Sequence, residues 1–198
     1  MSELTKLCGS KILIVCFAGR ALYKGCFSFE FVNHLTSLYE NKCDMIFYMD
    51  KTRTWYHKGI DGISTSIDET KDYLTNKIID NNYTKTIFIG VSAGGYAAIL
   101  FGSLCNVTNV VAFIPQTTLD KPKNIIYKDL KNVINTTTKY LLYGDPLIKN
   151  IDNYHNIYHC KHLEDLPNIK VIERNKFHVK HLRDSGEIKN IIDNIIYE

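Results

Sequence analysis

Short apolar runs alternate along the chain with stretches whose apolar positions recur at helical spacing. Six runs are predicted as strands: 11–18, 44–49, 85–90, 108–114, 138–143 and 169–173. Within each run the apolar residues are continuous, which is typical of strands buried on both faces of a parallel sheet. The pattern therefore predicts an α/β protein whose sheet is covered by helices on both sides.

Between the runs, helices are predicted with approximate bounds 27–40, 64–79, 93–104, 153–163 and 180–196. Ser64 or Ser66 is a candidate N-cap of the second helix. Alternating strands and helices imply right-handed crossovers, so we expect a three-layer, doubly wound, mostly parallel six-stranded sheet. The stretch 115–137 is long for a connection and is expected to hold a helix or a lid.

Composition agrees with a single domain over residues 1–198. The chain of 198 residues is 45% hydrophobic and 23% charged, which excludes intrinsic disorder. No apolar run approaches the roughly 18 residues needed to span a bilayer, so no membrane span is expected. The net charge of +3 is far from the concentrated positive field of a nucleic-acid-binding protein.

The cysteines and the N-terminal region favour a cytoplasmic protein. None of the 6 cysteines forms a CxxC pair or a zinc-binding spacing, and Cys16 and Cys105 lie in apolar stretches. Reduced thiols are therefore expected. Lys6 and Lys11 precede the apolar run 12–18, a faint likeness to a signal peptide, but the run fits a buried strand better.

A glycine-rich turn follows the third predicted strand. The sequence GVSAGG, residues 90–95, lies between that strand and a helix rich in small residues. This is the context of a nucleophile elbow, a strained turn that raises the Ser92 hydroxyl above the sheet. The backbone N–H of Ala93 then points to the same spot, where the helix dipole favours negative charge. The simpler alternative is a tight turn with an ordinary capping serine.

A carboxylate and an imidazole follow the last two predicted strands. Asp145 comes directly after 138–143, and His178 comes just after 169–173. A serine hydroxyl becomes a good nucleophile when a base takes its proton, and an acid orients that base. The chain order Ser92, Asp145, His178 therefore predicts a catalytic triad.

Alternatives to this acid and base stay open. His181 is a second candidate base, although its expected place is in the last helix. Asp152 replaces Asp145 as the acid if the loop folds differently, and Asp120 follows the fourth strand, where some hydrolases place their acid. Asp145 also stands in a Gly-Asp-Pro turn, where an aspartate commonly stabilises its own backbone.

On these residues the chain resembles a small α/β hydrolase from about residue 11 to 196. The resemblance implies a second oxyanion donor after KILIVCFAG, the backbone N–H of Gly19 or Arg20, although FAGR replaces the usual HGGG-type loop. It also implies a minimal six-stranded core without the usual first two strands. More narrowly, four segments are similar to hydrolase-like proteins linked to surface-polysaccharide biosynthesis: FSFEF (27–31), Asp50 with TWYHKG (50–59), GVSAGGYAA (90–98) and FIPQT (113–117).

Three further residues are candidates for substrate binding. Trp55 and Tyr56 follow the second strand, where an exposed aromatic pair can stack on a sugar or hold an acyl chain. They can equally pin their loop to the body of the protein. Gln116 follows the fourth strand and either hydrogen-bonds a substrate or simply ends the strand.

A histidine series carries a weaker metal signal. His155, His159 and His162 fall on one face of a predicted helix, but no HExxH-type carboxylate accompanies them. A packing or solvated face is the preferred interpretation, so no metal site is predicted. The basic residues between 121 and 139 lack the aromatic interleaving of a nucleic-acid site and are expected in solvent.

The sequence thus predicts a serine hydrolase that cleaves an ester or thioester, such as an acylated glycan, through an acyl-enzyme. No cofactor is implied. An acyltransferase with the same triad is the first alternative, and a non-catalytic binding protein of this fold is the second. For the triad, Asp145→Asn is expected to lower kcat about 10⁴-fold, and loss of Ser92 on the order of 10⁶-fold.

Overall fold

A seven-stranded sheet with strand order β1-β3-β2-β4-β5-β6-β7 forms the centre of the molecule. The computed structural model describes residues 1–20, 29, 31–120, 125–150 and 153–198. The strands are β1 (Glu3–Lys6), β2 (Ile12–Phe17), β3 (Asp44–Tyr48), β4 (Lys85–Val91), β5 (Asn109–Phe113), β6 (Lys139–Gly144) and β7 (Ile169–Glu173). All neighbouring pairs from β3 to β7 are parallel, which confirms the predicted mostly parallel sheet.

The predicted strand count of six was wrong, because β1 was missed. This strand runs antiparallel to β3 at the edge of the sheet, with Glu3 beside Tyr48 and Lys6 beside Met45. Its sequence, ELTK, has a single apolar residue, and none of its side chains is fully buried. An edge strand needs no apolar run, so its sequence gives no periodic signal.

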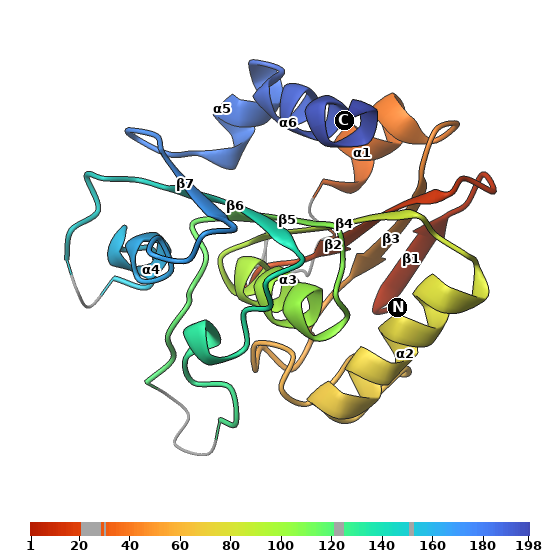
Figure 1. Ribbon diagram of the computed structural model, residues 1–198, viewed down its shortest axis with the longest axis horizontal. Coiled ribbons are helices and arrows are strands. Elements are labelled where there is room, and N and C mark those ends of the chain that lie inside the picture. The colour runs from red at the N-terminus through yellow and green to blue at the C-terminus, as the bar shows by residue number, and fades with distance from the viewer. Residues whose placement is uncertain (21–28, 30, 121–124, 151–152) are drawn as a thin grey trace.

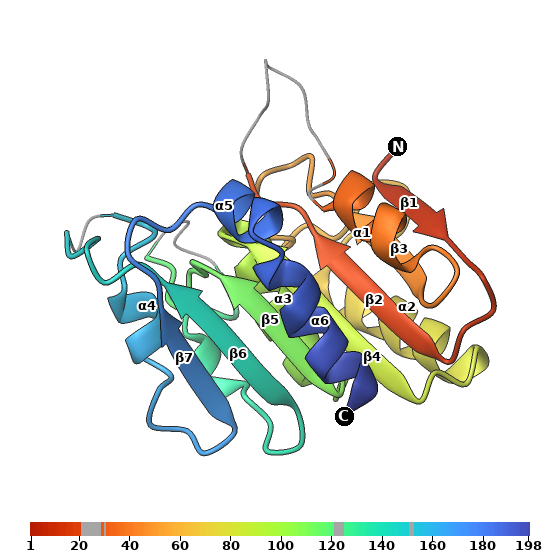
Figure 2. The ribbon, with the colours of Figure 1, turned by 90° about the horizontal axis from the view of Figure 1, so that it is seen from above.

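The helices lie in two layers, one on each face of the sheet (Figures 1 and 2). They are α1 (Val32–Tyr39), α2 (Ile67–Asp80), α3 (Ala93–Leu104), the short α4 (Tyr158–Lys161), α5 (Val179–Asp184) and α6 (Glu187–Tyr197), with a 3₁₀ turn, η1 (Leu130–Asn132). Figure 1 shows α1, α5 and α6 over one face and α2, α3 and α4 over the other. Each layer packs on its own apolar cluster, which confirms the three-layer prediction.

Local sequence explains the start of one helix and the buried faces of two others. Ser66 is the N-cap of α2, and its hydroxyl accepts a hydrogen bond from the N–H of Glu69. The α3 helix is almost wholly buried because its small residues let it lie directly on the sheet. The α6 helix buries isoleucines at i, i+3, i+4 and i+7, which face the sheet: Ile188, Ile191, Ile192 and Ile195.

Two predicted helices differ from the structure. The stretch predicted as one helix over 180–196 is divided into α5 and α6 by Gly186, whose φ of 78° ends a right-handed helix. The stretch 153–163 forms only the single turn of α4, so its histidines do not share one helical face. None of the helices in the described ranges is long and apolar enough to cross a membrane.

The parallel strands end together at one edge of the sheet. Phe17 of β2 lies beside Gly90 of β4, and Val91 of β4 lies beside Phe113 of β5. Residues that follow these strands therefore meet at this edge, where ligands bind in open α/β sheets.

Candidate active site

Ser92 occupies a strained turn between β4 and α3. Its φ of 56° and ψ of −118° lie outside the regions that most side chains adopt. A Cβ added at Gly90 would lie 2.0 Å from the carbonyl oxygen of Gly94, and one added at Gly94 would lie 2.0 Å from that of Phe17. Only glycine fits either position, so these contacts give the physical reason for the GVSAGG pattern.

Two side chains meet the hydroxyl of Ser92. The Nε2 atom of His155 lies 2.9 Å from Ser92 Oγ, and the Nε2 atom of Gln116 donates to the same oxygen over 3.2 Å. Ser92 itself is half-buried, and Gln116 is buried. Burial lowers the pKa of His155 below its ordinary value, because the charged imidazolium loses solvation.

A buried indole orients the amide of Gln116. The Nε1–H of Trp55 donates to Gln116 Oε1. The guanidinium of Arg20 lies 3.9 Å from the centre of the Trp55 ring system, a cation–π contact, and burial lowers the pKa of Arg20. The ring of Tyr154 also packs against Trp55, with 6.4 Å between ring centres. Trp55 thus lies among the residues around Ser92. It was considered as an exposed aromatic residue, but only 5% of it is exposed.

Tyr56 points away from this group. It is fully buried, and its hydroxyl lies within hydrogen-bond distance of the carbonyl oxygens of Ala18 and Tyr48. The carboxylate of Asp50 accepts the N–H groups of Thr52, Thr54 and Tyr56, which fixes the loop. Tyr56 therefore pins its loop to the body of the protein, the second of the two roles considered for this aromatic pair.

Asp145 and His178 do not contact each other or Ser92 through the hydrogen bonds of the described residues. Asp145 is buried, and its two oxygens accept the N–H groups of Leu147 (2.9 Å) and Phe177 (2.8 Å). His178 is exposed at the start of α5, where its Nδ1 accepts the N–H of Lys180. Asp145 thus joins the loops after β6 and β7.

Of the alternative acid and base residues, His181 and Asp120 form no hydrogen bond with the Ser92 hydroxyl in the described part of the chain. His181 is exposed, with its ring centre 5.5 Å from that of His178. Asp120 is exposed as well, and Asp152 lies outside the described residues.

The candidate oxyanion donors stand at the same edge of the sheet as Ser92. Ala93 is the first residue of α3, so its N–H has no acceptor within the helix. Gly19 and Arg20 follow β2 and are half-buried.

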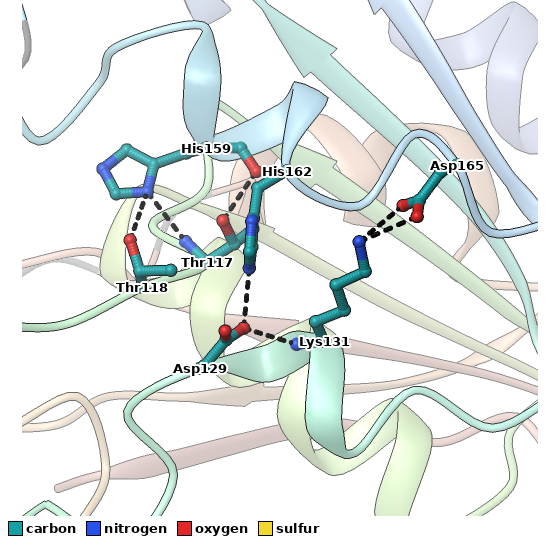
Figure 3. Close-up of polar contacts among 7 residues, drawn as sticks. All are labelled: Thr117, Thr118, Asp129, Lys131, His159, His162 and Asp165. Carbon is teal, nitrogen blue, oxygen red and sulfur yellow. Dashed lines mark hydrogen bonds and ion pairs between the residues drawn. The ribbon is translucent and has the colours of Figure 1, made fainter.

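The three histidines of 155–162 each bind a different segment. His155 meets Ser92, whereas Nδ1 of His159 accepts the N–H of Thr117, and Nε2 of His162 pairs with Asp129 over 2.8 Å. Figure 3 shows the last two contacts, which fasten α4 to the described part of 115–137. In the described ranges, no three histidine, cysteine or acidic side chains gather in a way that could hold a metal ion.

Sequence reasoning missed His155 as a neighbour of Ser92. The i, i+4, i+7 spacing suggested a helix, which would have turned all three histidines to one side. Instead, the backbone before α4 is irregular. The N–H of His155 bonds to Asn153 Oδ1, and Asn156 forms a β-bridge with Asp145. Polar turn residues on both sides of His155 were the available signal.

Comparison with known proteins gives likeness of structure only. No family model matches the chain, and no curated protein matches it in sequence. Three similar solved structures are the capsule O-acetyltransferase of Neisseria meningitidis serogroup A, an α/β hydrolase enzyme from a lagoon-sediment metagenome of Mar Chica, and a glycosylation-associated protein complex from Streptococcus agalactiae.

The extent of the likeness differs among the three. The O-acetyltransferase has a TM-score of 0.65 and 16% identity, over 91% of this chain and 87% of that one. The values for the hydrolase are 0.61 and 15%, over 97% and 92%. Those for the complex are 0.55 and 14%, over 94% and 42%. At these identities the likeness establishes the fold, so the chain has the α/β-hydrolase fold.

Proposed function

We propose that the protein is an acyl-transfer enzyme that cleaves an ester or thioester through an acyl intermediate on Ser92. The strained turn supports this role most directly. It places a half-exposed hydroxyl at the start of a helix and beside an imidazole, with φ of 56° at a residue that is not glycine. An ordinary capping serine takes extended backbone and bonds to its own helix, whereas Ser92 makes no side-chain cap.

Ser92 Oγ attacks the acyl carbonyl, and the carbonyl oxygen becomes an oxyanion. The N–H of Ala93 stabilises that charge, with the N–H of Gly19 or Arg20 as the second donor. A histidine receives the serine proton and returns it to the leaving group. The sequence predicts His178, oriented by Asp145, and His155 is a second candidate because its Nε2 lies 2.9 Å from Ser92 Oγ.

Water as the acyl acceptor makes the protein a hydrolase, whereas a sugar hydroxyl makes it an acyltransferase. The likeness to a capsule O-acetyltransferase favours the second candidate, and one structure of a histidine-to-alanine variant of that enzyme is a complex with CoA. In either case Trp55 supports the site through its hydrogen bond to Gln116, which in turn donates to Ser92.

Two measurements test the proposal. A fluorophosphonate probe is expected to label Ser92, as located by mass spectrometry, and Ser92→Ala is expected to lower ester turnover on the order of 10⁶-fold. Full turnover by folded Ser92→Ala would refute the mechanism. Acetyl-CoA or an aryl acetate, supplied with and without oligosaccharide acceptors, then separates water from sugar as acceptor.

Absence of any adduct on the folded protein would instead favour the non-catalytic alternative, a binding protein of this fold. The likeness to a glycosylation-associated protein complex is the observation that supports this alternative.

A further inference from the structure

We infer that His155 is the catalytic base for Ser92, and that Trp55 and Gln116 are positioning residues that direct the serine proton towards it. The inference rests on the proposed acyl chemistry at Ser92. It departs from the triad that the sequence predicts, because it takes the base from the loop after β6.

The direction of the hydrogen bonds begins at Trp55. An indole N–H only donates, so the end of Gln116 that meets Trp55 must be the amide oxygen. Most glutamine amides can be turned end for end, but here the buried indole permits one orientation. The other end, the amide NH₂, is therefore the end that meets Ser92 Oγ, at 3.2 Å. Gln116 can act there only as a donor.

Ser92 Oγ thus accepts from Gln116 and still has one proton to donate. The atom within reach is Nε2 of His155, at 2.9 Å. Burial keeps the imidazole neutral by lowering the pKa of His155, so one ring nitrogen lacks a proton. Among the described residues, His159 interacts electrostatically with His155, and its pKa is also lowered, chiefly by burial. With Nε2 as the unprotonated nitrogen, the chain runs in one direction from Trp55 through Gln116 and Ser92 to His155.

The backbone around His155 is held on both sides. Its own N–H bonds to Asn153 Oδ1 at 2.9 Å, and the next residue, Asn156, pairs with Asp145 in a β-bridge. Tyr154 packs on the Trp55 ring. The backbone that carries the imidazole is therefore held on both sides, and its neighbour Tyr154 packs on the indole that orients Gln116, which is the preorganisation that a catalytic base needs.

The step balances without another reactant. Ser92 Oγ forms a bond to the acyl carbon, its proton moves to His155 Nε2, and the carbonyl π electrons move to oxygen. Collapse of this intermediate expels the leaving oxygen or sulfur, which takes the proton from Nε2. An acceptor hydroxyl then repeats the sequence on the acyl-enzyme and returns the proton to Ser92. The hydrogen bond from Gln116 stabilises negative charge that develops on Oγ.

Kinetics of fluorophosphonate labelling at Ser92 test the base. His155→Gln keeps a side chain of similar size that cannot take the proton, and it is expected to slow labelling about 10²- to 10⁴-fold. His178→Gln is expected to slow it less than His155→Gln. The exposed His181 supplies a matched control, since His181→Gln is expected to label at the wild-type rate. A larger loss in His178→Gln than in His155→Gln overturns the inference and leaves the proposed function intact.

A second measurement needs no variant to fold and no activity. In the wild-type protein, ¹⁵N shifts of the histidine rings are expected to show His155 Nε2 without a proton at neutral pH. A protonated Nε2 would make His155 a donor to Ser92 and would overturn the inference. Failure of the wild type to label at Ser92 at all overturns the proposed function, and this inference with it.

Discussion

The turn at Ser92 and the loops after β6 and β7 are held in different ways. At the turn, backbone atoms meet around Gly90 and Gly94 with no room for a Cβ. The loops are held by single hydrogen bonds between distant residues, such as Asp145 to Phe177, 32 positions apart. The turn therefore cannot change shape without moving strands, whereas a loop can exchange one partner for another. The nucleophile is fixed by the sheet, and the choice of base depends on which loop reaches it.

The largest expected effect breaks the turn. In Gly94→Ala, the new methyl group would meet the Phe17 carbonyl, so we expect loss of more than about 3 kcal/mol of the free energy of unfolding. Gly95→Ala, at the next position of the same helix, is the control, since the nearest atoms to its added Cβ lie 3.1 Å away in Pro115. Urea titration measures both variants. Equal losses would mean that the contact with the Phe17 carbonyl does not set the cost at residue 94.

A smaller effect concerns Asp145. The Asp145 carboxylate links two loops by accepting one N–H group from each. Asp145→Asn replaces one of its acceptor oxygens by a donor, so we expect the free energy of unfolding to fall by about 1–2 kcal/mol. Labelling of Ser92 is expected to slow less than about tenfold, since the Asp145 carboxylate accepts from Leu147 and Phe177 rather than from His155. Asp120→Asn, at an exposed aspartate, is the control. A 10⁴-fold loss, as for a triad acid, would contradict this structural role.

A third prediction concerns the hydrogen bonds of Trp55 and Gln116. Trp55→Phe removes the indole donor and Gln116→Met removes the amide, and each is expected to slow labelling roughly tenfold, or about 1.4 kcal/mol. Because the two groups act in series, the double variant is expected to be no slower than the worse single one. A hundredfold loss in the double variant would show that the two residues act independently.

The smallest effect is a pH dependence in the loop after β3. His57 Nε2 donates to Tyr96 OH, which donates to Tyr127, and burial lowers the pKa of His57 to about 4. Between pH 6.5 and 4 the unfolded chain therefore binds a proton that the folded chain does not, so stability falls as pH falls. Asp50 opposes the shift through its charge.

Solvent screening of this half-buried group reduces the expected loss between pH 7 and pH 5 to about 1 kcal/mol. Urea unfolding at the two pH values, for wild type and His57→Gln, isolates this contribution, because all other groups titrate alike in both. An identical change in the two proteins would assign the pH dependence to other residues.

The strands and the turn could be predicted because their signals are local. Continuous apolar runs identify β2 to β7, and the glycine spacing around Ser92 identifies the strand-to-helix turn. The sequence does not give β1, because a polar edge strand has no periodic pattern. Gly186 is a helix-terminating residue, but the apolar spacing continues across it, so the pattern predicted one helix over 180–196.

The surroundings of Ser92 were less predictable. Gln116 was named as a candidate, but its partner Trp55 and the contact of His155 depend on loops from three different strands. Trp55 and Tyr56 are adjacent aromatic residues with positive φ values of 54° and 62°, yet the Trp55 ring reaches Gln116 whereas the Tyr56 hydroxyl reaches the backbone below the loop. Backbone conformation of that kind is set by the hydrogen bonds of Asp50 and is not written in residue type alone.

The contact between Ser92 and His155 spans 63 positions of the chain. Closing a flexible loop of that length costs on the order of 3–4 kcal/mol of entropy, more than one such hydrogen bond returns. The pairing of β4 with β5 and of β5 with β6 meets that cost before the two side chains touch. A destabilising substitution deep in β5 or β6 is therefore expected to lower the rate at Ser92 without contacting either residue. It lowers the fraction of molecules in which base and nucleophile are together.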